Sequence, residues 1–309
     1  MGRISSILQV ILPIFVAMGL GVLLRRTQTI SKEGMAGIQQ LVVRYLLPCV
    51  LFNAYLTCEL SAEALVCMGL LLPLLFIPCL WAFHARKKSL PYHNLPLIFT
   101  AQESGALGIP LFLVLFGQSQ VYHMAALDLT QGLLVLPVIA LLSAKQGDRP
   151  TVGSVLKGLF TSPLLLSGLL GLGLNLSGLM DVLDQAGIGP VITATTQFLA
   201  APISALMLFS AGYHFSLDKD SRSLILRLSL IRFLSFAAIG LVIQAALCLV
   251  PNVNPITRWA VLLYSTLPCT YIGPSLGRTQ QERMLASSMS SVLTVVSMLT
   301  FCVIAAITA

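Results

Sequence analysis

The chain has 309 residues, of which 57% are hydrophobic and only 9% are charged, and it carries a formal net charge of +7. Its mean hydropathy is +0.92, and a soluble domain, in which about a quarter of the residues are usually charged, cannot hide so much apolar surface from water. The basic residues lie in short clusters between apolar runs, which favours a lipid bilayer over nucleic acid as their partner. The seven cysteines form no CxxC pair, so neither a metal nor another cofactor is expected.

Ten apolar runs along the chain are each long enough to cross a bilayer as a helix, which takes about 20 residues. They cover residues 4–24, 36–56, 64–84, 94–116, 119–142, 153–175, 190–212, 224–250, 256–276 and 284–307. The sequence therefore predicts an all-α polytopic membrane protein with ten membrane-spanning helices.

The charges of the loops test this count, because Lys and Arg gather in cytoplasmic loops. Each loop after an odd-numbered span is basic, through Arg25, Arg26, Lys32, Arg86, Lys87, Lys88, Lys145, Arg149, Lys157, Lys219, Arg222, Arg227, Arg278 and Arg283. On the opposite side Arg258 is the one basic residue. The alternation predicts an integral protein of the plasma or inner membrane with both termini outside.

Glycine and proline interrupt corresponding spans of the two halves, residues 1–147 and 148–309. Pro48 and Pro202 lie at mid-span in the second span of each half. The fourth span of each half contains a cluster, made of Gly105, Gly108 and Pro110 in one half and Pro268, Gly273 and Pro274 in the other. Five spans followed by five reverse the orientation, so these halves would form an inverted repeat, and paired interruptions of this kind point to a transporter's substrate site. A single mid-span proline is more often a simple kink, whereas clusters in both halves favour a site.

Two acidic residues, Glu103 and Asp128, lie nine residues from the nearer span end, which is about 14 Å into the membrane. A charge at that depth costs several kcal/mol unless it is paired or hydrated, so both carboxyls are expected to face a cavity. The alternative is a protonated carboxyl bonded to a neighbouring helix. An ionised Glu103 would repel a substrate carboxylate about 4 Å away by roughly 4 kcal/mol. Glu103 could therefore couple anion binding to H⁺, or it could bind Na⁺ or a cationic solute directly.

Other polar residues near the interruptions complete the candidate site. Ser104 adjoins Glu103, and Thr270 and Tyr271 offer hydroxyls at the break in the second half, where a bond to another helix is an equal alternative to contact with a solute. Arg44 lies four residues before Pro48 on the same helix face, so it is a candidate partner for an anion. For both Arg44 and Arg232 the first expectation is that the side chain extends to the cytoplasmic interface, and binding of an anion by Arg44 is the alternative.

Other classes of protein find less support in the sequence. No HExxH, GxSxG or paired-aspartate motif occurs, so the chain is not expected to be an enzyme. A receptor or scaffold would normally carry a soluble domain, and no loop exceeds about 15 residues. A channel shares a polar pathway with a transporter and stays an alternative.

Three segments make the chain similar to the auxin efflux carrier family, in the superfamily of bile-acid, arsenite and riboflavin transporters. They run from Ile11 to Arg26, from Leu46 to Phe52 and from Glu103 to Leu111. The resemblance implies fourth and ninth helices that cross at unwound centres, and a secondary permease that moves a small organic anion, such as a carboxylate, by alternating access of a mobile bundle. It also implies that the chain could form a homodimer. Glu103 departs from the family pattern, which has at this position an asparagine associated with the substrate carboxylate, so a cationic or neutral solute stays an alternative.

Overall fold

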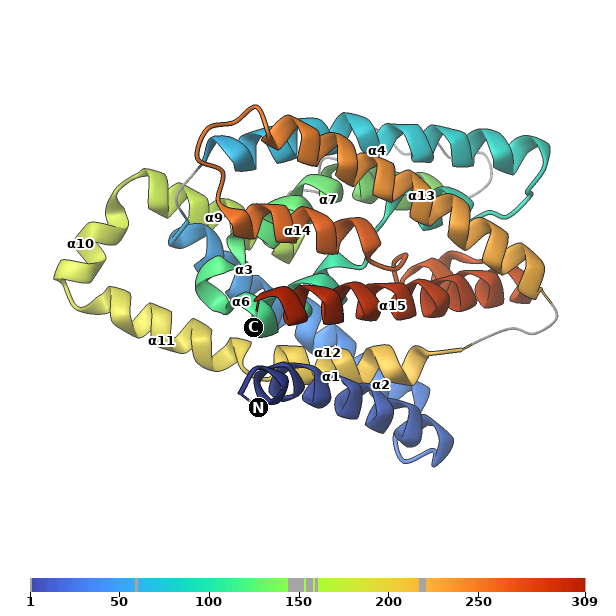
Figure 1. Cartoon of the computed structure of the whole chain (residues 1–309), viewed down its shortest axis with the longest axis horizontal. Helices are drawn as coiled ribbons and strands as arrows, with labels where there is room; N and C mark the ends of the chain where they lie inside the picture. The colour runs from blue at the N-terminus through green and yellow to red at the C-terminus, as the bar shows by residue number, and fades with distance from the viewer. Residues whose placement is uncertain are drawn as a thin grey trace.

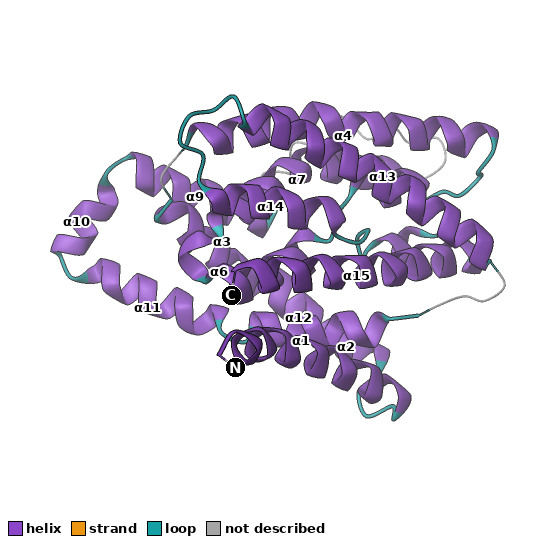
Figure 2. Cartoon of the chain, in the orientation of Figure 1, coloured by secondary structure: helices purple, strands orange, loops and turns teal. Residues whose placement is uncertain are grey.

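The computed structural model describes residues 2–58, 61–143, 161–216 and 221–308, together with Gly153 and Gly158. These residues are almost entirely helical, and the β-type pairing within them is an isolated antiparallel bridge between Gln102 and Cys269 (Figure 2). Six continuous helical stretches of the described chain are long and apolar enough to cross a membrane, namely Lys32–Leu56, Ala62–Lys88, Tyr122–Leu142, Ile188–His214, Arg222–Leu247 and Gln280–Thr308. The chain is therefore an all-α membrane protein.

The first half contains long helices and one that is divided. The helices are α1 (Gly2–Arg26), α2 (Lys32–Leu41), α3 (Leu47–Leu56), α4 (Ala62–Lys88), α5 (Leu95–Thr100), α6 (Ile109–Phe116) and α7 (Tyr122–Ser143). A π-helical turn, Val42–Leu46, joins α2 to α3 immediately before Pro48. Proline has no N–H to donate to the preceding turn of a helix. A π-helical turn holds one more residue than an α-helical turn and accommodates this loss, so the second predicted span stays helical. The fourth predicted span, in contrast, is divided between α5 and α6.

The described part of the second half also contains both long and short helices. The helices are α9 (Pro163–Leu176), α10 (Leu179–Gln185), α11 (Ile188–Ala200), α12 (Ile203–His214), α13 (Arg222–Leu247), α14 (Pro255–Thr266) and α15 (Gln280–Thr308). The turn at Ala201–Pro202 separates α11 from α12, and the short helix α10 was not predicted. The predicted span 256–276 is helical only through α14 and a 3₁₀ turn, Gly273–Leu276.

Parts of the sequence-based prediction lie outside the described residues. These parts are Lys145, Arg149, Lys157, Lys219, most of the first ten residues of the predicted span 153–175, and the boundary between residues 147 and 148.

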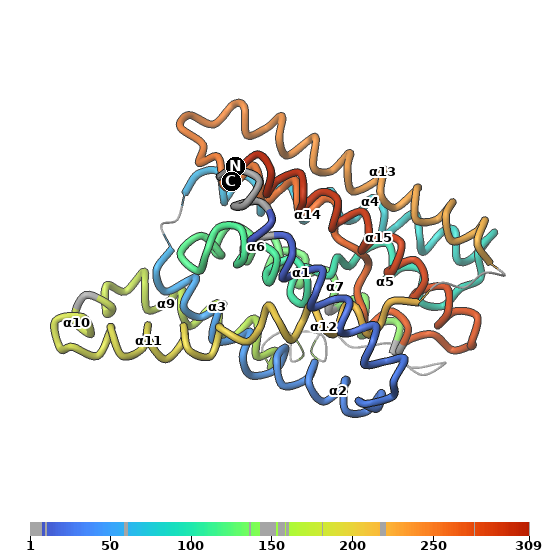
Figure 3. Tube along the Cα trace, turned by 60° about the horizontal axis from the view of Figure 1, so that its bottom comes forward, coloured from blue at the N-terminus to red at the C-terminus, as the bar shows by residue number. Residues whose placement is uncertain are grey.

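The helices pack into two bundles. The peripheral bundle contains α1, α2, α3, α9, α11 and α12, with the most extensive packing between α1 and α12 and between α3 and α9. The crossover bundle contains α4, α5, α6, α7, α13, α14 and α15, and α4 and α13 pack against each other in it. Figures 1 and 3 show the two bundles side by side, with α4, α13 and α15 on one side and α1, α2 and α12 on the other. The bundles meet where α12 contacts α6 and where α3 contacts α7.

Glycine allows the close approach of helices inside the peripheral bundle. A Cβ atom at Gly21 of α1 would overlap the backbone of Phe209 in α12, and one at Gly171 of α9 would overlap the backbone of Phe52 in α3. Small residues at such contacts let membrane helices approach closely and gain dispersion energy. The same type of contact therefore holds both of the main helix pairs of this bundle.

The close contact at Gly21 gives a prediction with a control on the same helix. Gly21→Leu is expected to lower the free energy of unfolding by about 1–3 kcal/mol, because the side chain has no space and must push α1 away from α12. Gly19→Leu is the control, since nothing lies within 4 Å of a Cβ atom there. Thermal unfolding of the purified proteins measures the stability of each variant. An equal loss of stability in Gly21→Leu and Gly19→Leu would contradict the packing argument.

Candidate functional site

Two unwound segments, residues 101–103 and 267–272, cross at the centre of the crossover bundle. The helix α14 ends at Thr266, and the next residue, Leu267, is extended, as a residue before proline prefers to be. The N–H of Glu103 donates to the carbonyl of Pro268 at 2.9 Å, and the N–H of Thr270 donates to the carbonyl of Ala101 at 3.3 Å. Each segment therefore satisfies backbone groups of the other that would otherwise be unpaired in the protein interior.

The side chain of Gln131, on α7, pairs with the free edge of the first unwound segment. The N–H of Gln102 donates to Gln131 Oε1 at 3.0 Å, and Gln131 Nε2 donates to the carbonyl of Gln102 at 2.9 Å. The hydroxyl of Tyr264 also donates to Gln131 Oε1, at 2.9 Å. The amide of Gln131 thus takes the place of a neighbouring strand, and it connects the crossing to α7.

Arg232, on α13, bonds both unwound segments from the other side. Its guanidinium donates to the carbonyls of Ile98 at 2.6 Å, Ala101 at 2.8 Å and Leu267 at 3.1 Å. It also donates to the side-chain oxygen of Gln102 at 2.5 Å. The carbonyls lie at the C-terminal ends of α5 and α14, where the helix dipoles are negative, so a cation stabilises both ends. Arg232 is only 1% exposed, so the expectation that it extends to the interface was wrong.

A cavity of about 530 Å³ lies between the two bundles and reaches the crossing. The peripheral bundle lines it with residues of α2, α3, α9 and α12, and the crossover bundle lines it with the unwound segments and α7. Its lining extends from Gln40, which is exposed on α2, to Glu103, which is 9% exposed at the break. Its size is that of a small-molecule site.

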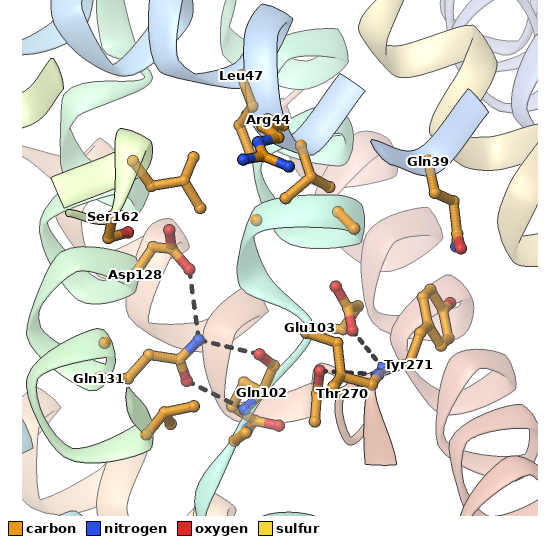
Figure 4. A pocket seen from close by; sticks show the side chains of 18 of the residues that line it. Gln39, Arg44, Leu47, Gln102, Glu103, Asp128, Gln131, Ser162, Thr270 and Tyr271 are labelled. Carbon is orange, nitrogen blue, oxygen red and sulfur yellow. Dashed lines mark hydrogen bonds between the residues drawn. The ribbon is translucent and has the colours of Figure 1, made fainter. Parts of the chain in front are cut away.

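Both predicted acidic residues lie on the wall formed by the crossover bundle (Figure 4). Glu103 Oε2 accepts the backbone N–H of Tyr271 at 2.5 Å, so the carboxylate of one broken segment bonds the backbone of the other. Asp128 Oδ1 accepts hydrogen bonds from the Ser104 hydroxyl and, at 3.3 Å, from Gln131 Nε2. In Figure 4 the second carboxylate oxygen of each residue points into the cavity. Asp128 is thus anchored through one oxygen and open through the other, and Glu103 is anchored by the backbone of Tyr271.

Arg44 lies on the opposite wall, in the π-helical turn before Pro48. Figure 4 shows its guanidinium across the cavity from Asp128 and Glu103. The side chain is exposed, so it retains water as a partner when the cavity is empty. The site therefore presents one positive group on the peripheral bundle and two acidic groups on the crossover bundle.

The structure brings together some of the predicted site residues and separates others. Arg44, Glu103, Gly105, Asp128, Thr270 and Tyr271 line the cavity. Ser104 lies behind this wall and bonds Asp128. The hydroxyl of Thr270 accepts the N–H of Ile272 at 3.3 Å, and that of Tyr271 meets Thr294 at 3.4 Å, so both hydroxyls have partners within the protein.

The other five predicted residues contribute through the backbone or through packing. A Cβ atom at Gly108 would lie 2.7 Å from Leu267, so this glycine permits the close crossing. The carbonyls of Pro110, Pro268 and Gly273 accept hydrogen bonds from Ser204, Glu103 and Asn94. Pro274 lines a separate cavity of about 30 Å³ beside Tyr271. None of these five is among the residues that line the large cavity.

Three residues that hold the site together were not predicted for it, namely Gln102, Gln131 and Arg232. Each is polar and lies inside an apolar run, which is the signal that could have indicated them. Apart from the contact of Gln131 with Asp128, the hydrogen-bond partners of these three side chains are more than 25 positions away in the sequence, so their polarity alone does not indicate which groups they bond.

The arrangement can bind a charged organic solute between two helical bundles. Models of known protein families do not match this chain, and a search of curated proteins gives no match either. The functional assignment therefore depends on the geometry of the site and on the sequence segments that resemble the auxin efflux carriers.

Proposed function

We propose that the chain is a secondary transporter that carries a small organic carboxylate through this cavity by alternating access. The observation that carries the proposal is the crossing of two unwound segments at a cavity with charged walls between two bundles. Irregular backbone at membrane depth is tolerated where it is buried or lines a cavity, and transporters place their substrate sites at such breaks.

The proposal includes ten membrane-spanning helices in two inverted halves, residues 1–147 and 148–309. Equivalent helices pack alike in support of it, because α1 meets α12 as α9 meets α3, and a glycine is in close contact in each pair. The two termini lie near each other in Figures 1 and 3, as an even number of crossings requires. With the basic loops in the cytoplasm, both termini would lie outside a plasma or inner membrane. A homodimer of such chains remains part of the proposal.

The boundary between the bundles suggests how access alternates. The cavity separates Arg44 of the peripheral bundle from Glu103 and Asp128 of the crossover bundle. The affinity for a solute that contacts both walls therefore depends on the relative position of the two bundles. The cavity has an exposed end at α2, the helix that begins at the basic residue Lys32, where Ala36 and Gln40 line it. In the proposed topology this end faces the cytoplasm, and the structure corresponds to an inward-open state. Movement of the crossover bundle would open the site to the other side.

Arg44 and Glu103 have separate roles in this proposal. Arg44 binds the solute's carboxylate, to which a guanidinium can donate two parallel hydrogen bonds. Glu103 takes up the coupling ion, H⁺ or Na⁺, because an ionised carboxylate near the solute's carboxylate would repel it. The backbone N–H of Tyr271 bonds Glu103, so loading of the coupling ion acts directly on the contact between the two broken segments.

Uptake into proteoliposomes tests the proposal. Labelled monocarboxylates, dicarboxylates and amino acids are presented under an inward H⁺ gradient or an inward Na⁺ gradient, with protein-free liposomes as the control. A transporter accumulates a solute above its external concentration. A channel only equilibrates it, an enzyme releases product without accumulation, and a scaffold does neither, so each of these results contradicts the proposal.

The space at Gly105 gives a further prediction. A Cβ atom there would lie 3.3 Å from Leu47 and 3.8 Å from each carboxylate oxygen of Asp128, so the glycine leaves room between the two walls. Gly105→Val is expected to raise the KM for uptake about tenfold or more, which corresponds to about 1.4 kcal/mol of lost binding. Gly173→Val is the control, because nothing lies within 4 Å of a Cβ atom at this exposed position. An unchanged KM in Gly105→Val would show that the solute does not occupy this space.

A further inference from the structure

The two walls of the cavity carry opposite charges, which restricts the solutes that can bridge them. Arg44 is on one wall, and Asp128 and Glu103 are on the other. We infer that the transported solute is a zwitterion, an α-amino acid with an apolar side chain, with its carboxylate on Arg44 and its ammonium on Asp128. This inference depends on the proposed function, because it names the substrate class of the same cavity.

Counting charges distinguishes a zwitterion from a simple anion. A monocarboxylate on Arg44 neutralises that arginine and leaves Asp128 and Glu103 without a positive partner in the cavity. An amino acid neutralises Arg44 with its carboxylate and Asp128 with its ammonium, and one H⁺ on Glu103 then balances the site. A charge left unbalanced at this depth costs several kcal/mol, so the walls favour a solute that carries both signs.

Asp128 is positioned to receive an ammonium group. Ser104 and Gln131 hold its Oδ1, while its other oxygen points into the cavity toward the wall that carries Arg44 (Figure 4). A Cβ atom at Gly105 would lie 3.8 Å from each carboxylate oxygen of Asp128, so the glycine leaves this face of the carboxylate uncovered. A carboxylate with one fixed and one free oxygen presents a defined acceptor to a compact donor, and an ammonium has three N–H groups to offer.

The remainder of the cavity is mostly apolar. Leucine, valine, isoleucine and methionine side chains from both bundles line it between the charged groups, among them Leu47, Leu129, Val135, Ile139, Leu164 and Met207. Apolar surface of this kind binds an aliphatic or aromatic side chain by excluding water. An extended dicarboxylate or a polyamine would place its second charge or its polar chain against this surface.

Matched sets of ligands test the inference by removing one charge at a time. The probes are L-leucine, 3-methylbutylamine, which lacks the carboxylate, and 4-methylpentanoate, which lacks the amine. Parallel sets use alanine, ethylamine and propanoate, and phenylalanine, 2-phenylethylamine and 3-phenylpropanoate. The rise of Tm with ligand concentration gives each Kd for the purified full chain. In at least one set, the amino acid is expected to bind about tenfold or more tightly than both of its analogues.

Two variants assign the charges to their partners. Arg44→Gln is expected to remove the advantage of the amino acid over its amine, and Asp128→Asn is expected to remove its advantage over its carboxylate. Arg26→Gln and Asp184→Asn are the matched controls, because both residues are exposed and neither lines the cavity. If the amino acid still binds more tightly than its amine in Arg44→Gln and more tightly than its carboxylate in Asp128→Asn, the assignment of its two charged groups to these residues is wrong.

The binding results also decide between the inference and the broader proposal. If in every set the carboxylate or the amine binds as tightly as the amino acid, or if no probe raises Tm, the zwitterion inference is wrong. Accumulation of a simple carboxylate in proteoliposomes would then leave the proposed transport function intact. Binding of an amino acid without accumulation of any solute would support the inference and contradict transport.

Discussion

In proteoliposomes that contain the Glu103→Gln variant, the rate of uptake driven by an H⁺ gradient is expected to be at least about tenfold lower than in the wild type. Exchange of solute across the membrane is expected to continue. Glutamine has nearly the same shape as glutamate, and its side-chain oxygen can still accept the N–H of Tyr271. It cannot bind or release a proton, so it resembles the loaded site at every pH. The wild-type rate is expected to fall as pH rises, because ionised Glu103 repels the solute's carboxylate, whereas the rate of the variant is expected to stay level.

The pH profile of Glu103→Gln separates coupling from a structural role. A variant that is merely destabilised would lose exchange and gradient-driven uptake together. Glu33→Gln is the matched control, since Glu33 is exposed at the start of α2 and does not line the cavity. If Glu103→Gln keeps the wild-type rate and the wild-type pH dependence, Glu103 does not take up the coupling ion.

Arg232→Met is expected to lower the free energy of unfolding by about 3–5 kcal/mol, which is at the upper end for a single substitution. The arginine bonds the carbonyls of Ile98, Ala101 and Leu267, and methionine has no donor to replace it. The carbonyl of Ile98 has no substitute partner in α5, because the N–H of Gln102 donates to Gln131 instead. Each buried acceptor that loses its donor costs about 1–3 kcal/mol.

The matched control for Arg232 lies on the same helix. Arg227→Met removes an exposed arginine of α13 and is expected to change the stability by less than about 0.5 kcal/mol. Arg232→Lys keeps the charge but lacks the planar set of donors that reaches several carbonyls at once, so an intermediate loss is expected. Thermal unfolding of the purified proteins measures all three. Equal stability of Arg232→Met and Arg227→Met would show that Arg232 does not hold the crossing together.

Several elements were predictable because their signals are local. Long apolar runs predicted helices where the structure has α1, α4, α13 and α15, since a helix satisfies its own backbone hydrogen bonds in hydrocarbon. The glycine and proline clusters predicted irregular backbone in the fourth span of each half, and the unwound segments lie there. Even so, the pattern at Pro48 resembled a break, whereas a π-helical turn keeps that span helical.

The charged residues of the cavity were also predictable, because a carboxyl or guanidinium deep in an apolar run needs a specific reason to be there. Glu103, Asp128 and Arg44 line one cavity, as expected for a shared site. The hydroxyls of Thr270 and Tyr271 were candidates to contact the solute, with a bond to another helix as the equal alternative, and the Tyr271 hydroxyl meets Thr294 of α15. In the structure the backbone N–H of Tyr271 makes the contact, because the unwound segment turns its amide toward Glu103.

The sequence by itself determined that the chain is an all-α membrane protein, that the fourth span of each half is irregular, and that Glu103 and Asp128 lie deep in it. Those properties follow from composition and from backbone chemistry within a few residues. Only the tertiary structure decided that the amide of Gln131 pairs with the first break, that Arg232 bonds both breaks, and that Arg44 opposes two carboxyls across a cavity. These contacts join distant segments, and packing between helices brings them together, so no local pattern in the sequence specifies them.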